Sequence, residues 1–466
     1  MPSFGTDGVR GIANTELTPE LALALGRVVA RRLVGDAFLV GRDTRRSGPL
    51  LQAALSAGLA SGGSNVIDLG VVPTPGLAYL CATRGEPGAM VSASHNPFED
   101  NGIKLISDAG TKLADSLERA IEADLEGEAA ARPLFDASAR AAPARPFGAA
   151  VGTILAEPGV LAAYVDHLVA VAGAGAGRLA DAGLRVVLDC ANGAASSIAP
   201  QVLERLGVSL EVMNAAPDGC NINAGCGSTH LEGLAERVVS SGADLGLAFD
   251  GDADRVLAAD EAGRIVDGDE LICMFALDLA RRRQLFGGAV VVSVMSNLGL
   301  HRSLTSHGID VIQTPVGDRY VVDSLEANGL VLGGEQSGHL VFRAEATTGD
   351  GILTAIKLLE LVARKSLPLG EIAREAMTRL PQVLRSIPMA SPERIESSAV
   401  ISQVVQEARR ALGDRGRVLV RASGTEPLVR VMAEAETHEL AIAVVEEIVA
   451  VAMSELSRDL PFDHPG

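Results

Sequence analysis

Three aspartates at alternate positions form a candidate metal site. Asp250, Asp252 and Asp254 lie in the segment DGDADR (250–255), directly after the apolar run LGLAF. Carboxylates so close together repel one another unless a cation neutralises them, and hard oxygen ligands suit Mg²⁺. The plainer alternative is an acidic turn in solvent. An EF-hand fits poorly, because its Gly and terminal Glu are not at the required spacing. The pattern predicts a metal loop that follows a buried strand.

A second loop contains a candidate nucleophile. The segment VSASHNPFEDNGIKL (91–105) starts apolar and then presents Ser92, Ser94 and His95. Ser, Asn and Pro also form ordinary turns, so this loop alone does not identify a reaction. No G-x-S-x-G elbow surrounds Ser94, which argues against acyl transfer. Beside a metal loop, a serine suits phosphoryl transfer, because the oxygens of a phosphoserine can ligate the cation.

A third loop, RASGTEPLVR (421–430), contains groups that suit a phosphate. Arg421 and Arg430 flank a turn of small residues, whose backbone N–H groups can face an anion while the guanidinium groups clamp it. The turn residues of this candidate clamp are Ser423, Gly424 and Thr425. An ordinary turn with surface arginines is the alternative.

Other polar positions could complete a sugar-phosphate site. Glu335 and Ser337 lie in GEQSGH (334–339), where they can hydrogen-bond sugar hydroxyls, although a tight turn explains them equally well. Lys104 follows the serine loop and could transfer protons near a metal and phosphates. Arg10, in FGTDGVRG, could contact phosphate or merely cap a turn.

All four loops follow apolar strands in a chain that alternates strands with helices. Strands are expected at 37–43, 65–71 and 88–94, and helices are expected to be capped near Thr18 and Thr229. The alternation predicts α/β domains with parallel or mixed sheets. Ligands of open α/β sheets bind at the carboxyl ends of strands, so the loops are expected to converge on one cleft.

The composition limits the possible partners and location. The chain of 466 residues is 47% apolar, has a net charge of −19 and contains no Trp, which disfavours nucleic acid and anionic membranes as partners. Five cysteines without a C-x-x-C pattern indicate free thiols. The polar start lacks a signal-peptide core, and Glu446 and Glu447 interrupt the apolar C-terminal run. A cytoplasmic protein is expected.

The loops together resemble a known family. In chain order, FGTDGVRG, SASHNP, DGDADR, GEQSGH and RASGTEPLVR resemble the motifs of the α-D-phosphohexomutases, across nearly the whole chain. Further segments are similar to the bacterial subgroup that acts on glucosamine phosphates: GDRYV (317–321), NINAGCGSTH (221–230) and TGDGILTA (348–355). The chain departs from the family pattern at Ala253, where Gly is common, and at Ala422, where Pro is common. Both departures leave the ligand side chains in place.

The resemblance implies a heart-shaped enzyme of four domains, in which three similar α/β domains with mixed sheets precede a smaller C-terminal α+β domain. The expected domains are 1–150 with the serine loop, 151–255 with the metal loop, 256–368 with the sugar loop and 369–466 with the phosphate loop. The implied reaction interconverts glucosamine 6-phosphate and glucosamine 1-phosphate through a phosphoserine enzyme and a 1,6-bisphosphate intermediate. A hexosamine or glucose 1,6-bisphosphate would prime the enzyme, which would serve the synthesis of UDP-N-acetylglucosamine.

The resemblance also implies roles for individual residues. Ser94 is the phosphoserine and holds one Mg²⁺ together with the three aspartates. Lys104 and His95 are the candidates for proton transfer, Arg10 joins the catalytic residues, and Arg255 stabilises the phosphoserine. The implied substrate-binding residues are Glu335, Ser337, Arg319, Arg421, Ser423, Gly424, Thr425 and Arg430.

Rival interpretations remain open at the level of sequence. A phosphomannomutase or phosphoglucomutase would apply the same chemistry to another sugar. A metal-dependent sugar phosphatase would use an aspartate of DGDADR as its nucleophile, whereas a non-catalytic sensor would have no need to retain Ser94 and Lys104. The expected partner is a small sugar phosphate, and the chain is expected to be a monomer or a homodimer.

Overall fold

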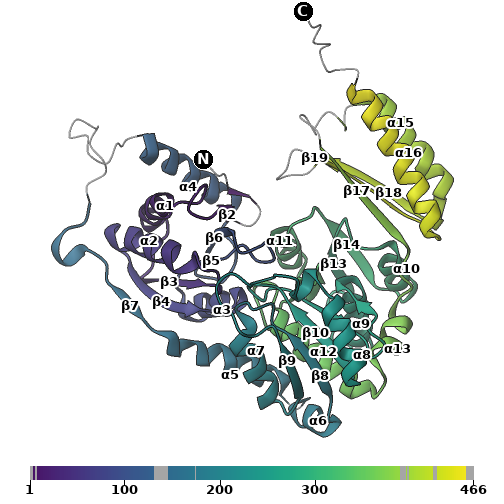
Figure 1. The fold of residues 1–466 in the computed structure, drawn as a ribbon, viewed down its shortest axis with the longest axis horizontal. Helices are drawn as coiled ribbons and strands as arrows, with labels where there is room; N and C mark the ends of the chain where they lie inside the picture. The colour runs from purple at the N-terminus through teal and green to yellow at the C-terminus, as the bar shows by residue number, and fades with distance from the viewer. Residues whose placement is uncertain are drawn as a thin grey trace, which may run out of the picture. The chain divides into compact units, whose positions relative to one another are not determined.

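The computed structural model describes residues 4–5, 8–130, 145–173, 175–388, 395, 398–422 and 428–457. The chain divides into a larger unit, Met1–Met295 with Gly308–Ala376, and a smaller unit, Ser296–His307 with Met377–Gly466. Figure 1 shows the elements of both units along the chain.

The first sheet of the larger unit has the strand order β1-β2-β6-β5-β3-β4-β7. Its strands are β1 (Phe4–Gly5), β2 (Gly8–Ile12), β3 (Ala37–Arg42), β4 (Asn65–Val71), β5 (Gly88–Val91), β6 (Asp100–Ile106) and β7 (Ile154–Ala156). Neighbours from β1 to β5 pair antiparallel, and neighbours from β5 to β7 pair parallel. The sheet is therefore mixed, as predicted.

Helices cover both faces of this sheet. They are α1 (Pro19–Arg32), α2 (Gly48–Ser61), α3 (Thr74–Arg84) and α4 (Asp115–Ala130). Phe38 and Val40 of β3 pack into the cluster that contains α1, α2 and α4, whereas Leu39 packs with α3 on the opposite face. This is the two-residue period of a strand that is buried on both sides. The predicted cap of α1 is confirmed, because the Thr18 side chain accepts from the Leu21 N–H.

The second sheet has the order β12-β11-β10-β8-β9. Its strands are β8 (Arg185–Asp189), β9 (Ser209–Met213), β10 (Leu245–Phe249), β11 (Val256–Ala259) and β12 (Ile265–Val266). The accompanying helices are α5 (Leu161–Ala172), α6 (Gly175–Ala182), α7 (Ala195–Arg205) and α8 (Glu232–Ser241), with short 3₁₀ turns η1 (Gly148–Ala150), η2 (Pro158–Val160) and η3 (Gly227–Thr229). The predicted capping box at Thr229 is wrong, because Thr229 ends η3 and Leu231 occupies the cap position of α8.

The third sheet has the order β14-β13-β15-β16. Its strands are β13 (Ala289–Ser293), β14 (Asp310–Thr314), β15 (Leu332–Gly334) and β16 (Leu340–Phe342), and the helices of this region are α9 (Gly268–Arg281), α11 (Asp318–Asn328), α12 (Gly351–Lys365) and α13 (Leu369–Ala376). Only β16 runs antiparallel to its neighbour. Every residue of β13 is buried, as its continuous apolar sequence predicts for a central parallel strand.

The smaller unit is built on one antiparallel sheet with the order β17-β19-β18. Its elements are α10 (Leu298–Ser306), β17 (Gln382–Pro388), α15 (Ala399–Leu412), η4 (Gly413–Arg415), β18 (Arg417–Ala422), β19 (Leu428–Glu434) and α16 (His438–Ser457). Valines such as Val405, Val431 and Val445 join α15, α16 and the sheet into one core. Buried Glu434 accepts from the Leu298 N–H at 2.8 Å, which attaches α10 to this unit.

The predicted architecture of three α/β parts and a smaller C-terminal α+β part is confirmed. The residue boundaries between domains stay a prediction: β7 lies after residue 150 yet joins the first sheet, and β11 lies after residue 255 yet joins the second. All five cysteines are free thiols, as predicted. Within the described part of the chain, no helix combines the length and hydropathy needed to cross a membrane.

The four predicted loops occupy equivalent places in their sheets. The serine, metal and sugar loops connect β5 to β6, β10 to β11 and β15 to β16, and each of these strand pairs is antiparallel. The phosphate loop connects the antiparallel strands β18 and β19 in the smaller unit. Each of the three loops of the larger unit is therefore the tip of a hairpin, which fixes its base to the sheet core through backbone hydrogen bonds.

A buried tyrosine links α5 to the start of α12. The Tyr164 hydroxyl donates to Asp350 Oδ2 at 2.8 Å, and Asp350 Oδ1 caps α12 by accepting from the Leu353 N–H at 2.9 Å. Both side chains are buried. Burial raises the pKa of Asp350 to about 6, although its hydrogen bonds act in the opposite direction.

This raised pKa predicts a pH dependence of stability. The folded protein binds the Asp350 proton more tightly than the unfolded chain, so stability should fall as pH rises from about 4 to about 6. Asp350→Asn keeps the capping oxygen and cannot ionise. Between pH 4 and pH 7, the wild type should therefore lose on the order of 2 kcal/mol more of its free energy of unfolding than the variant loses. Urea unfolding across this pH range measures the difference. Asp310→Asn, at an exposed position of β14, should keep the wild-type slope, and an unchanged slope in Asp350→Asn would contradict the assignment.

Candidate active site

Ser94 lies in the β5–β6 loop, and its hydroxyl reaches the metal loop of the second sheet. Ser94 Oγ donates to Asp250 Oδ2 at 2.5 Å, and the residue is 1% exposed. Its φ angle of 51° is left-handed, which is uncommon for a residue other than glycine. Ser92 points elsewhere, because its hydroxyl donates to Asp43 Oδ2 at 2.7 Å. The geometry therefore favours Ser94 over Ser92 as the serine beside the acidic loop.

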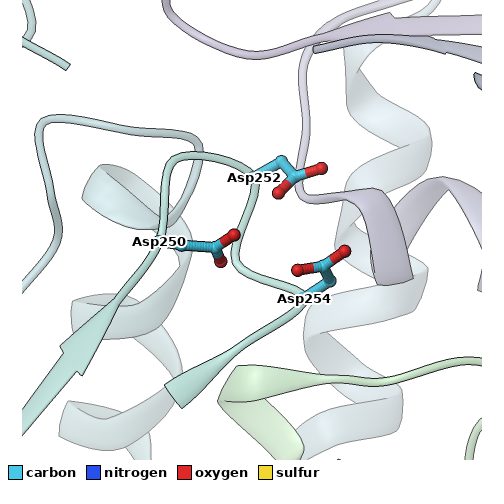
Figure 2. Close-up of side chains that lie close together, drawn as sticks. All are labelled: Asp250, Asp252 and Asp254. Atoms are coloured by element: carbon cyan, nitrogen blue, oxygen red, sulfur yellow. The ribbon is translucent and has the colours of Figure 1, made fainter. Parts of the chain in front are cut away.

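The three aspartates of the metal loop face one another around a single turn (Figure 2). One ligand oxygen from each residue lies within 4.8 Å of the others, and all three residues are buried. Oδ1 of Asp252 and Oδ1 of Asp254 are buried and accept no hydrogen bond from the described residues. Buried carboxylate oxygens without donors are suited to a hard cation, so the site fits a metal ion.

The turn itself explains one departure from the family pattern. Ala253 has a φ angle of 59°, in the left-handed region where glycine pays no steric penalty. The Ala253 carbonyl accepts from the Gly351 N–H at 3.0 Å, so the start of α12 supports this turn. The left-handed φ angle explains why Gly is common at this position.

Donors surround the outer side of the acidic cluster. Lys104 Nζ, on β6, lies 2.7 Å from Asp252 Oδ2 and 3.5 Å from Asp254 Oδ2. Thr74, at the start of α3, donates its hydroxyl to Asp252 Oδ2 at 2.6 Å. Lys104 is 3% exposed, so its ammonium group partly neutralises the cluster in a place with little water.

The surroundings drive the pKa values of two neighbouring carboxyl groups apart. Burial raises the pKa of Asp250 well above its usual range, and the charges of Asp254 and Asp252 raise it further. Burial also opposes ionisation of Asp252, but the charge and hydrogen bond of Lys104 hold the pKa of Asp252 below its usual range. Such divergence is expected for carboxylates held together in the absence of a cation.

His95 lies beside Ser94, Arg255 lies beside the metal loop, and Arg10 lies on β2. His95 Nδ1 is 3.4 Å from Ser94 Oγ. Burial, together with the charges of Arg255 and Arg10, lowers the pKa of His95 to about 4, so the imidazole is neutral near pH 7. Arg255 Nε lies 3.7 Å from Asp254 Oδ1, and Arg10 extends from β2 opposite Gly102 of β6.

The sugar loop is hydrogen-bonded to the metal hairpin. The Val256 N–H donates to the Gly338 carbonyl at 3.1 Å. Ser337 Oγ is buried and has no hydrogen-bond partner among the described residues. Glu335 Oε1 accepts from the Gly317 N–H at 3.2 Å, which connects the loop to the start of α11. These contacts bring the serine, metal and sugar loops of the larger unit together.

Arg319 has other contacts in this structure. Its guanidinium group pairs with Asp115 and with Glu118 of α4, the latter at 2.6 Å. The neighbouring Asp318 pairs with Lys112 at 2.6 Å. These ion pairs join α11 to the first sheet region, and the predicted contact of Arg319 with substrate stays a prediction.

The two arginines of the predicted phosphate clamp face each other across a hairpin. Arg421 of β18 is the direct cross-strand partner of Arg430 of β19. Like charges directly opposite on a sheet are destabilising by themselves, and a bound anion would relieve that repulsion. Ser423, Gly424 and Thr425 lie outside the described residues.

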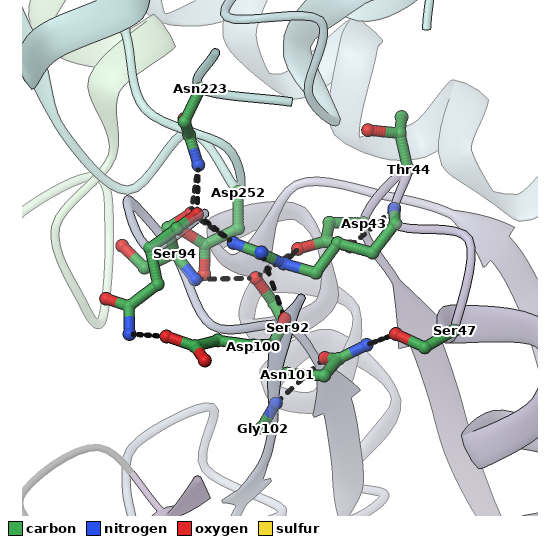
Figure 3. A network of polar contacts seen from close by, with 12 residues as sticks. Asp43, Thr44, Ser47, Ser92, Ser94, Asp100, Asn101, Gly102, Asn223 and Asp252 are labelled. Carbon is green, nitrogen blue, oxygen red and sulfur yellow. Dashed lines mark hydrogen bonds and ion pairs between the residues drawn. The ribbon is translucent and has the colours of Figure 1, made fainter. Parts of the chain in front are cut away.

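Sequence reasoning missed the buried arginine that supports the serine loop. Figure 3 shows the polar contacts around this loop, including those of Ser92 with Asp43 and of Ser94 with Asn223. Arg45 is 1% exposed, and its Nε donates to Asp43 Oδ2 at 2.9 Å. Its Nη2 donates to the carbonyl oxygens of Ser94 and Asn96, both at 2.9 Å. Asp43 directly follows β3, the parallel neighbour of β5, so its place at a strand carboxyl end was the available signal.

Thr74 and Asn223 were also missed. Thr74 binds Asp252 from the start of α3, and Asn223 donates to the Ser94 carbonyl at 2.8 Å from a long loop of the second sheet region. Thr74 lies three residues after β4 and Asn223 lies in the segment NINAGCGSTH, but neither belongs to a recognisable catalytic pattern. Both contacts join residues more than 100 positions apart, so only the folded chain reveals them.

The buried Arg45–Asp43 pair predicts a large stability effect. Arg45→Met would leave the Asp43 carboxylate buried without its cation, which should cost about 3–5 kcal/mol of the free energy of unfolding. Urea unfolding measures this cost. Arg46→Met, at the adjacent exposed position, should change stability by about 0.5 kcal/mol or less. Equal effects of the two substitutions would contradict a structural role for the pair.

Family models match all four parts of the chain. The alpha/beta/alpha domains I, II and III of phosphoglucomutase/phosphomannomutase match residues 1–132, 162–263 and 267–380, and the C-terminal domain of that family matches residues 385–451. Among solved structures, a putative phosphomannomutase from Thermus thermophilus shares 26% identity and a TM-score of 0.78, covering 97% of this chain and 99% of that one. The N-acetylphosphoglucosamine mutase of Aspergillus fumigatus, in complex with GlcNAc-6P and magnesium, shares the fold at 18% identity and a TM-score of 0.66, covering 97% and 96%.

Curated relatives are more similar in sequence. The phosphoglucosamine mutase of Symbiobacterium thermophilum is 49% identical over 459 residues, which cover 96% of this chain and 98% of the relative. The phosphoglucosamine mutase of Frankia alni is 49% identical over 466 residues, covering 97% and 98%. Together with the four matching domains, this full-length similarity shows that the chain belongs to the phosphoglucosamine mutases of the phosphoglucomutase/phosphomannomutase family.

Proposed function

We propose that this chain interconverts glucosamine 6-phosphate and glucosamine 1-phosphate, with Ser94 as the residue that carries the phosphoryl group. The observation that carries the proposal is the 2.5 Å contact between Ser94 Oγ and Asp250 in a buried cluster of three carboxylates. The preference for the amino sugar is supported by the curated relatives, which are named phosphoglucosamine mutases. The product would supply the synthesis of UDP-N-acetylglucosamine.

The proposed first step moves a phosphoryl group from Ser94 Oγ to O1 of glucosamine 6-phosphate. The bond from phosphorus to Oγ breaks as the bond to O1 forms, and the proton of the O1 hydroxyl is finally carried by Ser94 Oγ. In the structure, the unmodified Ser94 hydroxyl donates to Asp250, as the dephosphorylated enzyme would after this step. Neutral His95, 3.4 Å from Ser94 Oγ, and Lys104 are the candidates for carrying the proton.

The second step reverses the first at the other end of the sugar. The 1,6-bisphosphate turns over in the site, and Ser94 Oγ then accepts the phosphoryl group from O6, which leaves glucosamine 1-phosphate. One clamp must hold either phosphate while the other end reacts. We assign this role to Arg421 and Arg430 with the loop residues Ser423, Gly424 and Thr425, and we assign the ring hydroxyls to Glu335 and Ser337. Arg319 is a further candidate for substrate contact.

We further propose that the metal ion is Mg²⁺, held by Asp250, Asp252, Asp254 and an oxygen of phosphorylated Ser94. A bound Mg²⁺ would neutralise negative charge on the phosphoryl group during transfer. Arg255 and Arg10 would add positive charge beside the phosphoserine. A glucose 1,6-bisphosphate complex is known for a structural neighbour from Aspergillus fumigatus, which supports a hexose or hexosamine 1,6-bisphosphate as primer. The cytoplasmic location and a monomeric or homodimeric state remain predictions.

Two rival functions use parts of the same site. A phosphomannomutase or phosphoglucomutase would apply the same steps to another sugar, and a putative phosphomannomutase is among the structural neighbours. A phosphatase would release phosphate to water from an aspartyl intermediate in the metal loop. The directed contact from Ser94 Oγ to Asp250 favours the mutase, because a phosphatase of that kind has no need of the serine.

Metal binding should appear as a stability difference. Mg²⁺ at about 100 times its Kd should stabilise the wild type by about 2.7 kcal/mol, because it binds the folded state. Asp254→Asn removes one ligand and should abolish most of the Mg²⁺-dependent rise in Tm. Asp181→Asn, at an exposed position of α6, should respond like the wild type. The same Mg²⁺ response in all three proteins would place the metal elsewhere.

The phosphoserine is tested by covalent labelling. After incubation with ³²P-labelled glucose 1,6-bisphosphate, the wild type and Ser92→Ala should retain label, whereas Ser94→Ala should not. Formation of glucosamine 1-phosphate should fall by about 10³-fold or more in Ser94→Ala, because the group that carries the phosphoryl is lost. Parallel assays with glucose 1-phosphate and mannose 1-phosphate test the sugar. Faster turnover of glucose 1-phosphate or mannose 1-phosphate would show that the preferred substrate is that sugar phosphate and not the amino sugar. Label retained in Ser94→Ala would favour an aspartyl intermediate.

A further inference from the structure

We propose that Asn223 is a positioning residue that holds the serine loop in register with the metal loop. The proposal rests on the proposed phosphoserine function and adds a residue to which no role in the reaction has been assigned. Asn223 lies in the segment NINAGC, between β9 and η3, more than 100 residues from Ser94 in the chain. It is 7% exposed.

The amide of Asn223 binds two carbonyl oxygens of the serine loop. Its Nδ2 donates to the carbonyl of Ser94 at 2.8 Å and to the carbonyl of Asn96 at 2.9 Å. Arg45 Nη2 donates to the same two oxygens at 2.9 Å. Each carbonyl therefore receives one donor from the first sheet region and one from the second, which fixes the peptide planes that follow Ser94 and Asn96.

The metal loop also approaches the serine loop at the Ser94 carbonyl. A Cβ atom on Gly251 would lie 2.6 Å from the Ser94 carbonyl oxygen and 3.0 Å from Asn223 Nδ2. The Asn223 amide, the Ser94 carbonyl and the backbone beside Asp250 thus meet without room for a further atom. Asp250, the residue before Gly251, accepts a hydrogen bond from the Ser94 hydroxyl.

The backbone conformation of Ser94 depends on these contacts and sets the direction of its Oγ atom. Its left-handed φ angle of 51° is unfavourable for serine and has to be stabilised by contacts such as those to its carbonyl. If the peptide plane turned, the direction of Oγ would change with it. Because a displacement of about 1 Å at a reacting group can cost on the order of 10²-fold in rate, loss of the Asn223 contact should impair phosphoryl transfer.

Asn223→Asp tests the proposal with the smallest change. The backbone N–H of Asn223 donates to the Ala191 carbonyl at 3.0 Å, and its φ angle is 57°, a conformation that Asp also tolerates. The substitution replaces an amide donor with carboxylate oxygens that face two carbonyl oxygens. Asn14→Asp is the matched control, because Asn14 also has a left-handed φ angle, of 63°, but is exposed.

The experiment starts from ³²P-labelled phosphoenzyme and measures how much label is transferred to the sugar bisphosphate and how much is hydrolysed to free phosphate. The kcat is expressed per folded, labelled site. We expect kcat of Asn223→Asp to fall by about 10²-fold with little change in KM. The ratio of transfer to hydrolysis should fall by about 10-fold or more, and the backbone amides at 93–96 should exchange faster. Asn14→Asp should match the wild type in every respect.

The outcomes separate this inference from the proposed function. Unchanged kcat, partition ratio and amide exchange in Asn223→Asp would overturn it, as would a loss of activity fully explained by a smaller folded fraction. A wild type that neither retains label nor transfers it would instead overturn the phosphoserine function. Asn223→Gly, which removes the amide and relaxes the backbone, should reproduce the fall in the transfer ratio, and a normal ratio there would also contradict the proposal.

Discussion

Three carboxylates buried within a few ångströms of one another are the constraint on which the site depends. Asp250, Asp252 and Asp254 cannot all keep their charge there without compensation, and the chain supplies it unevenly. Lys104 and Thr74 stabilise the charge of Asp252, while Asp250 favours its proton and receives the Ser94 hydroxyl. Inner oxygens without donors remain for a cation. A cation bound between the three carboxylates would neutralise their mutual repulsion.

The surrounding fold holds this cluster by repeating one device. In the larger unit, an apolar strand leads into a polar loop, and an antiparallel strand returns from it, at β5–β6, β10–β11 and β15–β16. Backbone pairing anchors the base of each loop, and contacts between loops then set their tips. In the larger unit these are the Ser94–Asp250 hydrogen bond, the Val256–Gly338 backbone bond and the carbonyl contacts of Asn223.

The sequence predicted the strands, the loops and the acidic cluster because each is local. A strand buried on both faces is continuously apolar, and alternate aspartates directly after it are visible as a pattern. The contacts of Arg45, Thr74 and Asn223 are not local, since each joins segments that are neighbours only in the folded chain. The cap at Thr18 was predicted correctly, but the same reasoning failed at Thr229, where a 3₁₀ turn ends and the helix starts after Leu231.

A crystal of the phosphorylated protein soaked in Mn²⁺ gives the most direct test of the central claim, because the anomalous signal locates the ion without reference to activity. The account predicts one peak bounded by a carboxylate oxygen from each of Asp250, Asp252 and Asp254 and by an oxygen on Ser94. A peak at another site, or none at this cluster when the metal is saturating, would contradict the claim that the buried carboxylates and Ser94 form one metal centre.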